Sequence, residues 1–219
     1  MSSEKPVLAI LGGTGKEGPG LAMRWAHAGY HVIIGSRQAE KAVQTAAELN
    51  AKLGITDVEG MDNDSAARRA EICVLTVVQA AHTEALTGLV DALQGKILVD
   101  ATARVDFRDV RPPELPAAAR TAQTILGAGV RVVAAFQNVP AHALKKNLGE
   151  AIETDVLVCA DDVEAAKAVM QLAADGGMRA FYAGGLDNAV VVEGITGLLI
   201  SINKYYGSKT ASIAVTGLN

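Results

Sequence analysis

Short apolar runs alternate along the chain with segments of helical length and composition, and this alternation limits the folds that the chain can adopt. The apolar runs lie at residues 7–11, 31–34, 72–77, 96–99, 130–135 and 156–159. The helical segments lie at residues 19–28, 39–53, 80–93, 116–126 and 163–174. Continuous apolar runs are typical of strands covered on both faces of a parallel sheet, and strand–helix alternation favours right-handed crossovers. The sequence therefore predicts an α/β fold with a doubly wound, mostly parallel sheet.

The composition indicates a folded chain without a polyanionic partner. Half of the 219 residues are hydrophobic, and the formal net charge is −4. A negative chain has no bulk attraction to nucleic acid or to an anionic membrane, so neither partner is predicted. Cys73 and Cys159 lie in apolar runs, which suits buried thiols in a reducing compartment. Because no basic segment followed by an apolar one opens the chain, we expect a cytoplasmic protein.

The pattern changes near residue 139. We expect a nucleotide-binding domain at 1–138 and a smaller helical or α+β region at 139–219. A long helix is predicted over 187–206 and a strand-like tail over 210–215. Residues 189–202 are apolar but are interrupted by Glu193, and they are shorter than the roughly 20 residues that a membrane-spanning helix needs. The long helix is therefore predicted to be buried.

A glycine-rich loop follows the first apolar run directly. Residues 12–18 read GGTGKEG, in which Gly13, Gly15 and Gly18 have the spacing G-x-G-x-x-G. Between a strand and a helix, such glycines allow a tight turn, close backbone approach to a pyrophosphate, and packing of the helix on the strand. The N-terminus of the helix then offers free N–H groups to phosphates. The loop predicts a dinucleotide site in a Rossmann-like fold.

The second predicted strand ends on a serine and an arginine instead of an acidic residue. NAD-binding proteins of this fold place an Asp or Glu there, against the ribose 2′-hydroxyl. This chain has Ser36, Arg37 and, one helical turn later, Lys41. A guanidinium can bind phosphate oxygens through paired charge-assisted hydrogen bonds, and an ammonium adds a point charge. The sequence therefore predicts NADP in preference to NAD.

The sequence contains few candidate metal ligands and few candidate catalytic acids or bases. The histidines and cysteines form no metal-binding spacing, so no metal site is predicted. Tyr205 and Lys209 have the Tyr-x-x-x-Lys spacing of short-chain dehydrogenases, but Gly207 interrupts the helix that such a pair needs. We expect no catalytic acid or base. Hydride transfer between two flat heterocycles fits this lack, because stacking them supplies proximity and orientation.

A series of motifs in this order resembles those of one reductase family. The motifs lie at residues 11–15, 35–37 with Lys41, 74–76, 138–141, 156–159 with Asp161 and Asp162, and 186–188. Together they resemble the coenzyme F420H2:NADP oxidoreductases, also called NADPH-dependent F420 reductases. The resemblance implies a Rossmann-like domain that holds NADP, a small C-terminal region that holds the deazaflavin F420, and a homodimer. The implied reaction is reversible hydride transfer between nicotinamide C4 and deazaflavin C5.

The resemblance also implies roles for single residues. With the loop and the cationic residues above, the expected NADP-binding set is Gly13, Thr14, Gly15, Lys16, Glu17, Gly18, Ser36, Arg37, Lys41, Thr76, Val77, Gln79, Val105 and Ala141. The expected deazaflavin-binding set is Gln137, Asn138, Asn188, Tyr206, Gly207, Ser208 and Lys209.

Three alternatives stay open at this stage. Residues 101–116 form either a lid over the substrate or a plain connector. Arg104, Arg108 and Arg111 bind the phosphate and glutamates of F420 or are solvated loop charges. The protein could also reduce another small unsaturated compound, such as an imine or a carbonyl, or sense NADP without catalysis.

Overall fold

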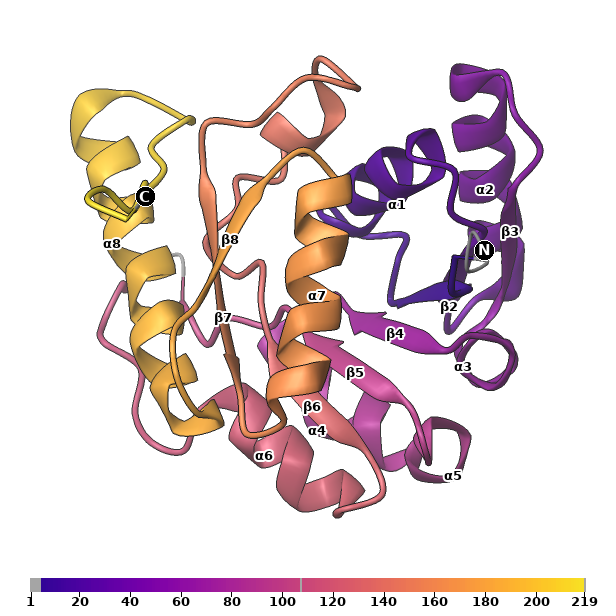
Figure 1. The fold of residues 1–219 in the computed structure, drawn as a ribbon, viewed down its shortest axis with the longest axis horizontal. Coiled ribbons are helices and arrows are strands. Elements are labelled where there is room, and N and C mark those ends of the chain that lie inside the picture. Colours follow the sequence, from indigo (N-terminus) through magenta and orange to yellow (C-terminus); the bar gives the residue numbers. More distant parts are fainter. Residues whose placement is uncertain (1–4, 107, 219) are drawn as a thin grey trace.

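The computed structural model describes residues 5–106 and 108–218, and its centre is one eight-stranded sheet (Figure 1). The strand order is β3-β2-β1-β4-β5-β6-β7-β8. Strands β1 to β6 are parallel, β7 is antiparallel to β6, and β8 is parallel to β7. The strands are β1 (Leu8–Leu11), β2 (Val32–Ser36), β3 (Val58–Asp62), β4 (Ile72–Leu75), β5 (Ile97–Asp100), β6 (Arg131–Ala134), β7 (Asp155–Ala160) and β8 (Arg179–Tyr182). The predicted α/β fold is confirmed.

Helices cover both faces of this sheet. They are α1 (Gly18–His27), α2 (Ala39–Leu53), α3 (Asn63–Arg69), α4 (Gln79–Thr87), α5 (Val90–Leu93), α6 (Ala118–Leu126), α7 (Val163–Asp175) and α8 (Ala189–Tyr206), with 3-10 turns η1 (Ala143–Lys145) and η2 (Leu186–Asn188). Alternate residues of a strand point to opposite faces. Accordingly, Leu8 and Ile10 join the core beneath α1, α2 and α7, whereas Ala9 and Leu11 join the core on the α3 and α6 side.

The two edge strands of the sheet were not predicted from the sequence. Strands β3 and β8 lie at the two edges and are only partly buried, so neither forms a continuous apolar run. The short helix α3 was missed as well, because it buries only Ala66 and Ala67. The single helix predicted over 80–93 is two helices, α4 and α5, separated at Gly88 and Leu89.

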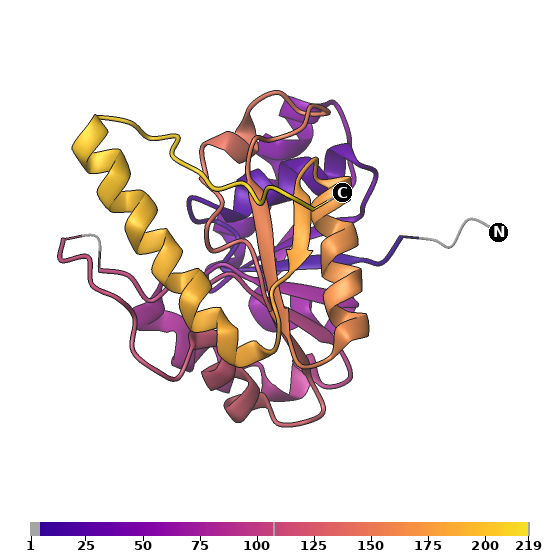
Figure 2. The same ribbon diagram turned by 60° about the vertical axis from the view of Figure 1, so that its left-hand side comes forward.

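The prediction of a buried long helix is wrong. The stretch 186–206 is long and apolar enough by composition to cross a membrane, and only 33% of its apolar 18-residue window is buried. Val191, Leu198 and Ile202 on α8 are 64%, 65% and 44% exposed. Figure 2 shows α8 along one side of the molecule, with the loop that follows β5 beside it. The apolar character of residues 189–202 therefore overestimated the burial of this helix.

The tail at 210–215 forms no strand, contrary to expectation. It still runs back along the start of β7, where the Asp155 N–H donates to Ile213 O at 3.0 Å and the Ser212 hydroxyl donates to Glu153 O at 2.8 Å. The expected domain boundary at 138/139 falls between β6 and β7, and the sheet continues across it.

Candidate functional site: a glycine-rich nucleotide cavity

The loop after β1 is held tightly by its glycines. A Cβ on Gly13 would stand 2.6 Å from Ile10 O, and one on Gly18 would stand 2.6 Å from Gly13 Cα. Both positions therefore require glycine for the turn and for the approach of α1 to β1. At Gly15 the nearest heavy atom to such a Cβ is 3.7 Å away, an ordinary van der Waals distance, and the residue is exposed. The loop thus leaves one exposed backbone segment at the N-terminal end of α1.

A cavity of about 830 Å³ opens beside this loop at the carboxyl ends of the first strands. Ligands of open α/β sheets bind at this edge. The lining residues are Gly12, Thr14, Gly15, Ser36, Arg37, Gln38, Lys41, Asp62, Asn63, Asp64, Thr76, Val77, Val78, Ala81, Glu84, Ala85, Gly88 and Leu89. The cavity therefore brings together seven residues expected for NADP: Thr14, Gly15, Ser36, Arg37, Lys41, Thr76 and Val77.

The far end of this cavity carries two cations. Arg37 and Lys41 line it, and neither forms an ion pair with another residue in the described part of the chain. The neighbouring carboxylates of Asp62 and Asp64 interact with other groups. Asp62 accepts from the Ser65 N–H at 2.9 Å, and this bond lowers its pKa, while Asp64 pairs with Arg68 at 2.8 Å. A phosphate is the ligand that this end of the cavity suits.

Asn63 was not foreseen from the sequence. Its Oδ1 accepts from the Gly12 N–H at 3.1 Å, and it lies 2.8 Å from where a Cβ on Gly35 would stand. The side chain therefore joins the glycine loop to the start of α3. The available signal was an Asp-Asn-Asp sequence at 62–64, which is typical of a helix start.

Glu17 lies at the start of α1, and part of its carboxyl is buried. Its Oε1 has no hydrogen-bond partner within the described residues. Burial raises the pKa of this carboxyl from 4.5 to about 8, because the charged form loses hydration.

Several expected NADP-binding residues lie outside the cavity lining. Gly13 and Gly18 are buried within the turn, where their role is the packing described above. Lys16 and Gln79 are exposed at the starts of α1 and α4. Val105 is buried in the loop after β5, and Ala141 stands between β6 and η1.

The residues expected for the deazaflavin fall into separate groups. Gln137 Nε2 donates to Asp100 O at 3.0 Å, and Asn138 Nδ2 donates to Asp155 O at 2.7 Å. Both side chains are buried, and their amide oxygens have no partner within the described residues. Buried acceptors of this kind are suited to N–H donors of a ligand.

The other two groups stand at opposite ends of α8. Asn188 precedes the helix, and the exposed residues Tyr206, Gly207 and Lys209, with the partly buried Ser208, close it. Gly207 has a φ of 63° and ends the helix, as its position predicted. The 18 residues of α8 span about 27 Å, so one ring cannot contact both groups within a chain.

The three arginines of the loop at 101–116 differ in their partners and in their exposure. Arg104 Nε donates to Glu193 Oε2 at 2.8 Å, and the Glu193 side chain is fully buried. Arg104 is therefore neither a free anion ligand nor a solvated charge, because it neutralises a carboxylate in the interior. Arg111 pairs with Asp109 at the surface, and Arg108 is exposed.

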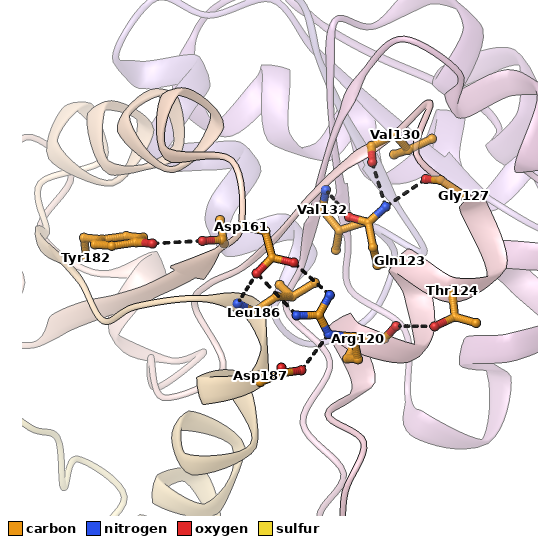
Figure 3. A network of polar contacts seen from close by, with 11 residues as sticks. Arg120, Gln123, Thr124, Gly127, Val130, Val132, Asp161, Tyr182, Leu186 and Asp187 are labelled. Atoms are coloured by element: carbon orange, nitrogen blue, oxygen red, sulfur yellow. Dashed lines mark hydrogen bonds and ion pairs between the residues drawn. The ribbon is translucent and has the colours of Figure 1, made fainter.

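A second arginine fixes the entry to α8. Arg120 on α6 binds Asp161 at 2.8 Å and Asp187 at 2.6 Å, and Asp161 also accepts from the Leu186 N–H (Figure 3). Asp162 caps α7 through the Ala165 N–H at 2.9 Å, as expected for an acidic residue at a helix start. The network ties α6, β7 and η2 together.

A strand, a glycine turn and a helix beside an open cavity with a cationic end define a Rossmann-like dinucleotide-binding protein. Residues 7–104 match the family described as NADP oxidoreductase, coenzyme F420-dependent. The chain is 40% identical to the F420-dependent NADP reductase of Methanothermobacter thermautotrophicus, over 96% of this chain and 95% of that protein. Identity to the Methanocaldococcus jannaschii reductase is 39%, over 96% and 98%. The chain belongs to the F420-dependent NADP reductase family.

The fold is shared with solved structures. A crystal structure from Arthrobacter sp. FB24 has a TM-score of 0.79 at 25% identity and covers 96% of this chain and 100% of its own. An imine reductase from Bacillus cereus has a TM-score of 0.61 at 20% identity, over 92% of this chain and 60% of that one. The second likeness concerns the fold alone.

Proposed function

We infer that this protein is an oxidoreductase that transfers a hydride reversibly between NADP(H) and coenzyme F420. The observation that carries the assignment is the identity of about 40% to F420-dependent NADP reductases over nearly the full length of both chains. The cavity chemistry agrees, because its cationic end suits the extra phosphate of NADP. Reduction of an imine or a carbonyl is not favoured, since the imine reductase likeness is one of fold.

We propose that the glycine loop and the cationic end hold NADP. Backbone N–H groups of residues 14–17 would bind the pyrophosphate, helped by the positive end of α1. Ser36, Arg37 and Lys41 would bind the 2′-phosphate, and Thr76 and Val77 would line the path toward the nicotinamide. The exposed backbone of Gly15 in the cavity lining supports this arrangement, since a phosphate needs close backbone approach there.

On the second-substrate side we propose that Gln137 and Asn138 accept hydrogen bonds from the deazaflavin. Their buried, unpartnered amide oxygens lie just beyond β6, at the same sheet edge as the nucleotide cavity. The nicotinamide and the deazaflavin supply the hydride chemistry when both are bound. The chain then needs to position two rings and exclude water, and proximity and orientation account for the acceleration.

A spectroscopic assay tests the proposed reaction. Mixing the protein with NADPH and F420 should bleach the deazaflavin absorbance as NADPH is consumed, and NADP with F420H2 should reverse the change. No absorbance change with both substrates at saturation would remove the assignment. Oxidation of NADPH by an imine or a carbonyl compound, with none by F420, would identify a different reductase.

We further propose that the protein is a homodimer formed through α8. Val191, Leu198, Ile202 and Tyr205 are exposed and recur at spacings of seven, four and three residues, so they form one stripe on the helix. A second copy of this chain is the partner that such a stripe suits, because an isologous contact repeats the same surface. On this proposal, 1–138 holds NADP, and 139–219 supplies the deazaflavin contacts and the dimer contact. The cytoplasmic location stays a prediction.

A further inference from the structure

A second cavity lies away from the nucleotide cavity, between α1, the segment after β6 and the C-terminal tail. Its volume is about 290 Å³. Arg24, His142, Lys146, Glu153 and Thr154 are among its lining residues. We call it the Arg24 cavity.

The cation in the wall of this cavity is buried and lacks a counter-ion. Arg24 is 4% exposed, and its guanidinium donates only to carbonyl oxygens, of residues 144, 146, 147, 150 and 176. No carboxylate in the described part of the chain pairs with it. Burial lowers its pKa, which reflects the cost of a desolvated charge. An anion nearby would offset that cost.

Two residues that line the cavity, Thr154 and His142, each carry an unsatisfied polar atom. Thr154 is 2% exposed, and its Oγ1 has no hydrogen-bond partner within the described residues. His142 Nε2 is buried and likewise unpartnered there. Buried polar atoms without partners are rare in native proteins and point to a missing ligand or water. A hydroxyl and an imidazole can both donate to an anion.

The charges around the cavity favour an anion over a cation. Arg24 and Lys146 are positive, whereas Glu153, which is exposed, is the carboxylate in the lining. The tail closes one side, where Ser212 donates to Glu153 O at 2.8 Å. Thr210 also lines the cavity and directly follows Lys209, so the cavity borders the turn that we expect to contact the deazaflavin.

We propose that the Arg24 cavity binds an anionic group, a phosphate or a carboxylate, through Thr154, His142 and Lys146. The anion could be part of F420, whose tail carries a phosphate and glutamates, or it could be a free ion. The first source rests on the proposed function, and the second does not. The loop arginine Arg104 is not available for the same task, because Glu193 holds it.

The experiment has a substrate arm and a binding arm, both on the full-length protein. In the first, kcat/KM is measured for F420 and for the same deazaflavin without phosphate and glutamates. Thr154→Val removes a hydroxyl at nearly constant volume, so the ratio of the two kcat/KM values should fall about tenfold, the scale of one lost hydrogen bond to a charged group. Thr124→Val on α6 is the matched control, because Thr124 is exposed and does not line the cavity.

In the second arm, inorganic phosphate is titrated while the Tm is followed. Phosphate should raise the Tm of the wild type, and less so that of Thr154→Val. Changes in both arms assign the cavity to the F420 tail, and a change in the phosphate arm alone supports a free anion. If neither arm responds, the proposal is wrong. Should Thr154→Val fail to fold, Lys146→Met replaces it, because Lys146 is exposed.

This design separates the two proposals. If the wild type reduces neither deazaflavin, the proposed function fails, while the phosphate titration still tests the cavity. If both deazaflavins are reduced and no variant alters the ratio or the phosphate response, the function stands and the anion site falls.

Discussion

At the scale of single residues, the cationic end of the nucleotide cavity depends on Arg37. Arg37 is exposed and has no ion-pair partner among the described residues, so it is available for a phosphate. Arg37→Ala should weaken NADPH binding by about 1 to 3 kcal/mol and leave NADH nearly unchanged, since NADH lacks the 2′-phosphate. Fluorescence titration with both nucleotides checks this. Equal losses would contradict the phosphate assignment, and Arg131→Ala, another exposed arginine, is the control.

Glu17 carries a pH-dependent prediction. Its pKa is about 8 in the folded protein and 4.5 without burial, so between these values only the folded state keeps the proton. Stability should therefore fall as the pH rises from about 4.5 to about 8. Glu17→Gln removes this loss and should be more stable than the wild type by about 1 to 3 kcal/mol at pH 8, but not at pH 4. Urea unfolding across this range measures it, with the exposed Glu40→Gln as control. An unchanged pH slope in Glu17→Gln would refute it.

At the scale of elements, α8 and the loop after β5 are joined by the ion pair of Arg104 and Glu193. The Glu193 carboxylate is fully buried and also accepts from the Ala118 N–H at 2.7 Å, so it links α8 to α6. Glu193, the charged residue that interrupts the apolar stretch 189–202, therefore has a structural role inside the molecule.

Removing the cation of this pair should be costly. Arg104→Met leaves a buried carboxylate without its partner, and the expected loss of unfolding free energy is about 3 kcal/mol. Arg111→Met breaks only the exposed pair with Asp109 and should cost less than about 1 kcal/mol. Urea denaturation compares the two variants. Equally small losses of unfolding free energy in both variants would mean that the buried Glu193 carboxylate does not need Arg104 as its partner.

At the scale of the whole molecule, the exposed stripe on α8 predicts self-association. Leu198→Lys places a charge in the middle of that stripe and should convert a dimer to a monomer at micromolar concentration, because a desolvated ammonium opposes burial. Sedimentation velocity measures the change. Val43→Lys, at an exposed apolar position on α2, should leave the dimer intact. A monomeric wild type, or a dimeric Leu198→Lys, would rule out this interface.

Local residue chemistry was sufficient to predict the inner sheet, the glycine turn and the cationic end of the nucleotide cavity. Strands buried on both faces of a parallel sheet are apolar throughout, so they can be recognised as apolar runs in the sequence. Gly13 and Gly18 leave no room for a side chain, so the turn can be recognised from its glycine spacing. The tertiary structure alone decided which charges are free. Arg37 and Arg104 look alike in sequence, yet a carboxylate 89 positions away neutralises only Arg104. The burial of α8 and the cavity beside Arg24 depend in the same way on which distant segments fold against them.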